Sequence, residues 1–142
     1  MTIPASVREI QTCAFYCCRN LTRVEFEQSG SLLKVIGREA FYGCRCLRTI
    51  DLPNDLEEIG LRAFKETGLE SVTTPSSVRI IRQSAFCKCP NLKRVMLNEG
   101  LEVLGTDEYA PDGRPWCGVF QESGVESIEM PSTLRRIEYN AF

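Results

Sequence analysis

The eight cysteines are the residues of this chain best suited to chemistry, because thiolates bind zinc and paired thiols form disulfides. They are Cys13, Cys17, Cys18, Cys44, Cys46, Cys87, Cys89 and Cys117. Two Cys-x-Cys pairs could each contribute zinc ligands. Structural zinc sites, however, usually space their ligands by two to four residues and often use His, and this chain contains no His. We therefore expect neither a metal site nor a cofactor.

Three of the cysteines occupy one position of a repeated pattern. Cys18, Cys44 and Cys89 each follow a Phe by three residues, and Thr or Ser takes that place in other copies. Free Cys behaves as a small apolar side chain, so we expect these three to be structural residues in a core column. Side chains two turns apart cannot reach disulfide distance. Mostly free thiols are expected, and an oxidised pair involving Cys17, Cys46 or Cys117 remains open.

Other catalytic chemistry has little support. Without His there is no His-based triad, and the ten glycines form no phosphate-binding loop. Neighbouring acids such as Glu57 and Glu58 point to different sides. We expect no catalytic residues and no enzyme. The 17 basic and 19 acidic side chains nearly balance, which argues against a nucleic-acid partner, and no apolar run could span a bilayer.

The element that must position these residues is a repeat marked by Ala-Phe. The marker Phe residues are Phe15, Phe41, Phe64 and Phe86, with an imperfect copy at Phe120 and a last Ala-Phe at Phe142. A period of about 22 or 23 residues is typical of a solenoid, whose units stack because none can bury its apolar side alone. Each unit predicts one clear strand, a second short extended stretch and one turn of helix between them. We therefore expect a mainly β solenoid with parallel ladders and stacked Phe residues.

The repeats predict one domain over residues 1–142. They lie near 3–26, 27–52, 53–74, 75–97, 98–130 with an insertion at 106–118, and 131–142, which is incomplete. About six turns are expected, uncapped at both ends, in what we interpret as a fragment of a longer protein. The open terminal faces predict end-to-end self-association.

One full unit reads Ile-Pro-x-Ser-Val-x-x-Ile-x-x-x-Ala-Phe-x-x-Cys-x-x-Leu-x-x-Val. Its residues in the first repeat are Ile3, Pro4, Ser6, Val7, Ile10, Ala14, Phe15, Cys18, Leu21 and Val24. This pattern resembles the BspA-like class of leucine-rich repeats, and the resemblance covers essentially the whole chain. It implies a right-handed leucine-rich-repeat superhelix without a catalytic motif.

Family members are often surface-exposed proteins of mucosal bacteria and protist parasites, whose repeats bind matrix proteins or host cells. The resemblance therefore implies a protein-protein interaction module of an adhesin-like protein, secreted or at the cell surface. The alternative is an intracellular scaffold or regulatory repeat domain in the cytoplasm, which free thiols and the missing signal-peptide pattern favour.

Two surfaces are candidates for partner binding. The first is the solvent face of the strand ladder, because the extended inner faces of solenoids are their usual binding surfaces. Its candidate residues are Arg23, Glu25, Thr49, Asp51, Thr73, Arg94, Met96 and Glu129. They are mixed in charge and include no aromatic anchor, so an ordinary solvated sheet face is the alternative.

The second candidate is the insertion, Thr106–Gly118, which interrupts the period between Phe86 and Phe120. Its Pro and Gly residues predict a protruding loop. It contains Tyr109, Arg114 and Trp116, which are residue types enriched at interface hot spots. The alternative is that Trp116 folds back onto the solenoid flank and covers its edge.

Overall fold

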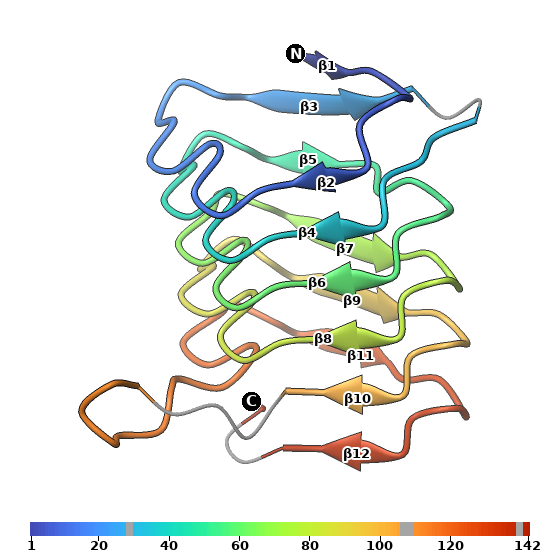
Figure 1. Ribbon diagram of the computed structural model, residues 1–142. Coiled ribbons are helices and arrows are strands. Elements are labelled where there is room, and N and C mark those ends of the chain that lie inside the picture. Colours follow the sequence, from blue (N-terminus) through green and yellow to red (C-terminus); the bar gives the residue numbers. More distant parts are fainter. Residues whose placement is uncertain (28–29, 106–109, 139–140) are drawn as a thin grey trace.

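The chain is a right-handed parallel β-solenoid in a computed structural model that describes residues 1–27, 30–105, 110–138 and 141–142 (Figure 1). Each repeat contributes two short strands joined by tight corners. The strands are β1 Thr2–Ile3, β2 Glu9–Ile10, β3 Arg23–Phe26, β4 Val35–Ile36, β5 Thr49–Ile50, β6 Glu58–Ile59, β7 Ser71–Thr74, β8 Ile80–Ile81, β9 Arg94–Leu97, β10 Val103–Leu104, β11 Ser127–Glu129 and β12 Arg136–Ile137.

The strands form two faces. The even-numbered strands make one continuous six-stranded sheet from β2 to β12. The odd-numbered strands make two three-stranded sheets, β1-β3-β5 and β7-β9-β11, so the ladder is divided between β5 and β7. All pairs are parallel and join equivalent positions of successive repeats, as Ile36 does with Ile10 and with Ile59. The last repeat contributes only β12 to the described sheets, so fewer than six turns are complete there, against about six expected.

The sequence of the strands explains which side chains enter the core. Along β3, Val24 and Phe26 are buried while Arg23 and Glu25 are exposed. The same alternation occurs in β7 and β9, as expected where successive side chains point to opposite faces. The predicted strands and their inward positions are therefore confirmed.

The Phe residues form a continuous column through the core. Successive rings from Phe15 to Phe142 are stacked with centroids 5.0–5.8 Å apart and interplanar angles of 3–16°. Aromatic pairs contribute about 0.5–1.5 kcal/mol beyond their buried area. The predicted stacking is confirmed, and it holds the repeats in one register.

The predicted turn of helix between the strands is wrong. The described residues contain no helix, and hence none long and apolar enough to cross a membrane. Around Phe15 the backbone amides alternate: Tyr16 donates to Cys13 within a turn, whereas Phe15 donates to Ala40 of the next repeat at 2.8 Å. A helix would satisfy these amides internally. The stacked corners instead use every second amide to join neighbouring repeats.

Each corner requires a left-handed residue two places after the Phe. The residues there are Cys17, Gly43, Glu66, Lys88 and Glu122, with φ between 55° and 71°. Only one of the five is glycine, although a side chain in this region costs roughly 1–2 kcal/mol. The corner geometry is therefore imposed by stacking against the neighbouring repeats.

Candidate functional site

The outward side chains of the odd-numbered strands form two columns along the rod, a surface that we call the strand face. The first column is Arg23, Thr49, Ser71, Arg94 and Ser127, and the second is Glu25, Asp51, Thr73, Met96 and Glu129. Members of one strand are two residues apart, so the columns lie about 6.7 Å from each other. The structure thus brings all the residues predicted for this surface onto one face.

Charge is divided between the two columns. The arginines are in the first column and the carboxylates in the second. Arg23 and Glu25 form an ion pair of 2.8 Å. Among the described residues, by contrast, Asp51, Arg94 and Glu129 make no ion pair and no side-chain hydrogen bond. The strand face therefore carries charges of both signs that are available to a partner.

The flanks of the solenoid use their charges differently. Basic residues of the second and fourth repeats pair with acidic residues of the repeats that follow them. Examples are Lys34–Glu57 at 2.8 Å, Arg48–Glu70 at 2.8 Å and Lys93–Glu126 at 2.6 Å. Such exposed pairs contribute about 0–1 kcal/mol each. Flank charges thus serve repeat-to-repeat pairing, whereas the three unpaired charges of the strand face serve no contact within the described chain.

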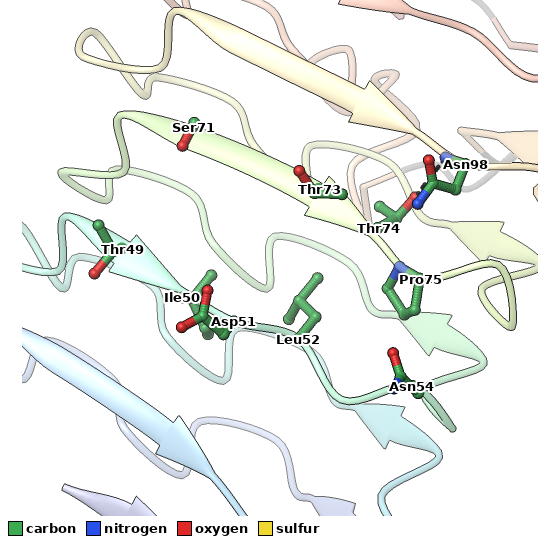
Figure 2. A pocket seen from close by; sticks show the side chains of 10 residues that line it. All are labelled: Thr49, Ile50, Asp51, Leu52, Asn54, Ser71, Thr73, Thr74, Pro75 and Asn98. Carbon is green, nitrogen blue, oxygen red and sulfur yellow. Dashed lines mark hydrogen bonds between the residues drawn. The ribbon is translucent and has the colours of Figure 1, made fainter. Parts of the chain in front are cut away.

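A hollow of ≈ 340 Å³ lies in the strand face where the ladder is divided between β5 and β7 (Figure 2). It is lined by Thr49, Ile50, Asp51, Leu52, Asn54, Ser71, Thr73, Thr74, Pro75 and Asn98. Sequence reasoning missed Asn54 and Asn98, because both lie just beyond strands, at corners that the repeat pattern treats as loops. A hollow of ≈ 190 Å³ follows between β7 and β11, and one of ≈ 510 Å³ lies toward β1.

The insertion does not join the strand face. The guanidinium carbon of Arg62 lies over the Trp116 ring, 3.8 Å from the ring centroid. The Trp116 carbonyl accepts a hydrogen bond from Gln83 at 3.4 Å. Arg62 also pairs with Glu39 at 3.1 Å. Such cation–π contacts contribute about 0.5–2 kcal/mol. Trp116 therefore lies against the corner that follows the even-numbered strands.

The tip of the insertion is a polar turn. Arg114 is exposed and binds Asp112 through two nitrogens at 2.6 and 2.9 Å, while the Ala110 amide donates to the Arg114 carbonyl. Tyr109 lies outside the described residues. Of the two described candidates, Trp116 is engaged by the flank and the Arg114 charge is paired within the turn.

Comparisons with known proteins agree with this architecture. A family model described as the BspA type leucine-rich repeat region matches residues 9–110 and 117–142, in six copies. This chain belongs to the BspA-type leucine-rich repeat family. The residues between the two matched ranges, 111–116, lie within the insertion.

Two solved structures resemble this leucine-rich repeat chain. A leucine-rich repeat protein from Bacteroides ovatus is 28% identical, with a TM-score of 0.71, over 97% of this chain and 36% of that one. The pneumococcal vaccine antigen PcpA is 25% identical, with a TM-score of 0.52, over 94% of this chain and 39% of that one. This chain thus spans little more than a third of either relative. A search of curated proteins found no match.

The cysteine column of this leucine-rich repeat is only partly in the core. Cys44 and Cys89 are fully buried, and their thiols donate to the carbonyls of Phe15 and Phe64, each at 3.1 Å. Cys18 is exposed, which corrects its prediction as a core residue. Cys44 and Cys89 are covered because each thiol packs on the preceding repeat. Cys18 belongs to the first repeat, and no described turn stacks on that side of it.

Burial also suppresses thiol chemistry in the repeats. It raises the pKa of Cys44 to about 11, and together with neighbouring Cys117 it raises the pKa of Cys87 to about 12. These thiols stay protonated at neutral pH and are poor nucleophiles. All eight cysteines are free, and no group of metal-binding side chains is assembled within the described ranges.

Proposed function

We propose that this chain is a non-catalytic module that binds a protein partner through its strand face. The observation that supports this most is the contrast in charge pairing. Flank charges pair between repeats, whereas Asp51, Arg94 and Glu129 on the strand face have no partner in the described chain. Complementary charges on a partner give specificity and speed association. Extended solenoid faces are also the surfaces that repeat proteins use for binding.

The wider role that we propose is that of an adhesin-like protein, secreted or at the cell surface, that binds host or matrix proteins. The support is the family membership and the similarity to PcpA, which is a vaccine antigen. A second candidate is an intracellular scaffold, favoured by the eight free thiols. Counting reactive thiols in protein purified under oxidising conditions separates the two, because disulfides indicate an extracellular protein.

Binding to a panel of purified extracellular-matrix proteins tests the proposal. A variant carrying Asp51→Ala, Arg94→Ala and Glu129→Ala should weaken any binding at least tenfold, since it removes the unpaired charges of the strand face. The matched control, Lys34→Ala with Glu57→Ala, removes a charge pair from the flank and should bind like the wild type.

A third variant without residues 106–118 tests the competing surface. Retained binding by this variant, together with loss in the strand-face variant, supports the proposal. Full binding by the strand-face variant to every ligand that the wild type binds would overturn it, and so would loss only in the variant lacking the insertion.

A further inference from the structure

We propose that the hollow between β5 and β7 is a pocket for a lysine or arginine side chain of the protein partner. The inference rests on the proposed function, because it assigns a chemistry to one position of the strand face. It depends on the acceptors at the rim, the apolar floor and the divided ladder.

The rim of the hollow presents hydrogen-bond acceptors and one negative charge. Asp51 is unpaired, and the hydroxyls of Thr49, Ser71 and Thr73 make no hydrogen bond to described residues. Figure 2 shows these four side chains along β5 and β7 at the hollow. An ammonium group has three donors and a guanidinium five, and neither has an acceptor. Bonds from such a cation to Asp51 would be charge-assisted and stronger than neutral ones.

The floor of the hollow suits the stem of the same side chains. Ile50 and Leu52 line it from β5 and the segment after it, and Pro75 lines it from the end of β7. Lysine and arginine pack their methylene groups on apolar surfaces while their charged ends remain at polar positions. An apolar floor beneath an acceptor rim therefore matches both parts of one side chain.

The electrostatics exclude an acidic occupant. No Lys or Arg lines the hollow, and Asp51 stands in the column that also contains Glu25 and Glu129. The two arginines of the first column do not neutralise Asp51 in the hollow: Arg23 pairs with Glu25, and Arg94 does not line the hollow. A carboxylate placed there would meet Asp51 without a compensating cation.

Of the three hollows described along the strand face, the one at the divided ladder is lined without Lys or Arg. β5 and β7 are adjacent but not paired, whereas β7 pairs with β9 through four residues, from Ser71–Arg94 to Thr74–Leu97. The hollow of ≈ 190 Å³ includes Arg94 and the hollow of ≈ 510 Å³ includes Arg23, so an arginine already lines each of them. The hollow at the division, where β5 and β7 face each other without pairing, is therefore the one that leaves Asp51 without a basic neighbour in its lining.

NMR titration of the ¹⁵N-labelled chain tests the pocket directly, without the protein partner. The probes are acetyl-Gly-X-Gly-amide peptides in which X is Lys, Arg, Gln or Glu, at low ionic strength. Lys and Arg peptides should shift the backbone amides of Asp51, Thr73 and Asn98, with dissociation constants on the order of millimolar. The shifts should weaken as salt is added, because the charges are exposed.

Substitutions at matched acidic positions identify the group responsible. Asp51→Asn should weaken Lys and Arg binding at least tenfold, while Glu102→Gln, which lies outside the strand face and pairs with Arg79, should leave it unchanged. Absence of shifts with Lys and Arg, equal binding of the Gln peptide, or equal losses in both variants would overturn the inference. Lysine binding without any matrix-protein binding would leave the pocket in place and remove support for the proposed function instead.

Discussion

Buried thiols are the residues whose environment most changes their chemistry. The pKa of Cys44 is raised to about 11 and that of Cys87 to about 12, against about 8.5 for a free thiol. Unfolding therefore releases protons above pH ~8.5. The contribution of these thiols to stability is complete below that pH and is lost as pH rises toward 11–12, by about 1.4 kcal/mol per pH unit for each thiol.

We therefore expect the urea midpoint to fall between pH 8 and pH 10.5, as followed by circular dichroism in a non-thiol reductant. The control is the double variant Cys44→Ala, Cys87→Ala, which lacks two of the three buried thiols and should show a shallower fall over the same range. An identical slope in the two proteins would mean that other groups, such as lysines and tyrosines, cause the effect.

Left-handed residues at the corners offer a direct test of backbone strain. Lys88 has φ 58° and an exposed side chain whose contact with Glu122 is long, at 3.8 Å. Lys88→Gly should raise the free energy of unfolding by about 0.5–1 kcal/mol, because glycine adopts this conformation without steric cost. Lys88→Ala is the matched control, since it removes the same ion pair but keeps the Cβ. Equal stability of the Gly and Ala variants in urea titrations would contradict the argument.

The Phe column is the element that should dominate stability. Phe64 is fully buried and stacks on Phe41 and Phe86, whereas Phe15 is half-buried and stacks only on Phe41 among the described rings. Phe64→Ala should cost about 3–5 kcal/mol, as for other buried aromatics, and Phe15→Ala clearly less. Urea unfolding of both variants measures the difference. Equal losses would show that the column is not the nearest-neighbour stack described here.

The repeat pattern could predict the strands and the Phe stack because both depend on spacing along the chain. It could not predict the burial of each copy, which depends on what lies on the neighbouring side. Cys18 and Cys44 share a repeat position, yet only Cys44 is covered by a preceding repeat. The pattern also predicted a helical turn, because apolar spacing does not reveal that alternate corner amides bond to the next repeat.

The candidate sites were less predictable than the fold for a similar reason. Trp116 has the side chain of a hot-spot residue, but its contact with Arg62 joins positions far apart in sequence. The strand-face columns followed directly from alternation along each strand. The hollow did not, because the division between β5 and β7 occurs in a ladder whose repeats look alike in sequence.

At the scale of the whole molecule, the face formed by the last described repeat contains the two most exposed large hydrophobic side chains among the described residues. Ile137 and Phe142 are 50% and 55% exposed, and Phe142 borders a hollow of ≈ 320 Å³ lined also by Phe120, Val125 and Ile128. Among the described strands, none pairs with the outer edges of β11 and β12. An open ladder edge beside exposed apolar side chains favours association with another copy.

We therefore expect the 142-residue chain to self-associate end to end as its concentration rises, with β12 of one copy adding to β2 of the next. Such a head-to-tail contact is not closed by symmetry, so sedimentation velocity should show a series of oligomers and not a single dimer.

Ile137→Lys with Phe142→Ser should shift the distribution to monomer, because the substitutions place charge and polarity on the contact. Met96→Ser is the matched control: it removes an exposed apolar side chain, 40% exposed, from the strand face and should leave association unchanged. A wild type that remains monomeric at high concentration would contradict the prediction, and association abolished by Met96→Ser would place the contact on the strand face instead of the end.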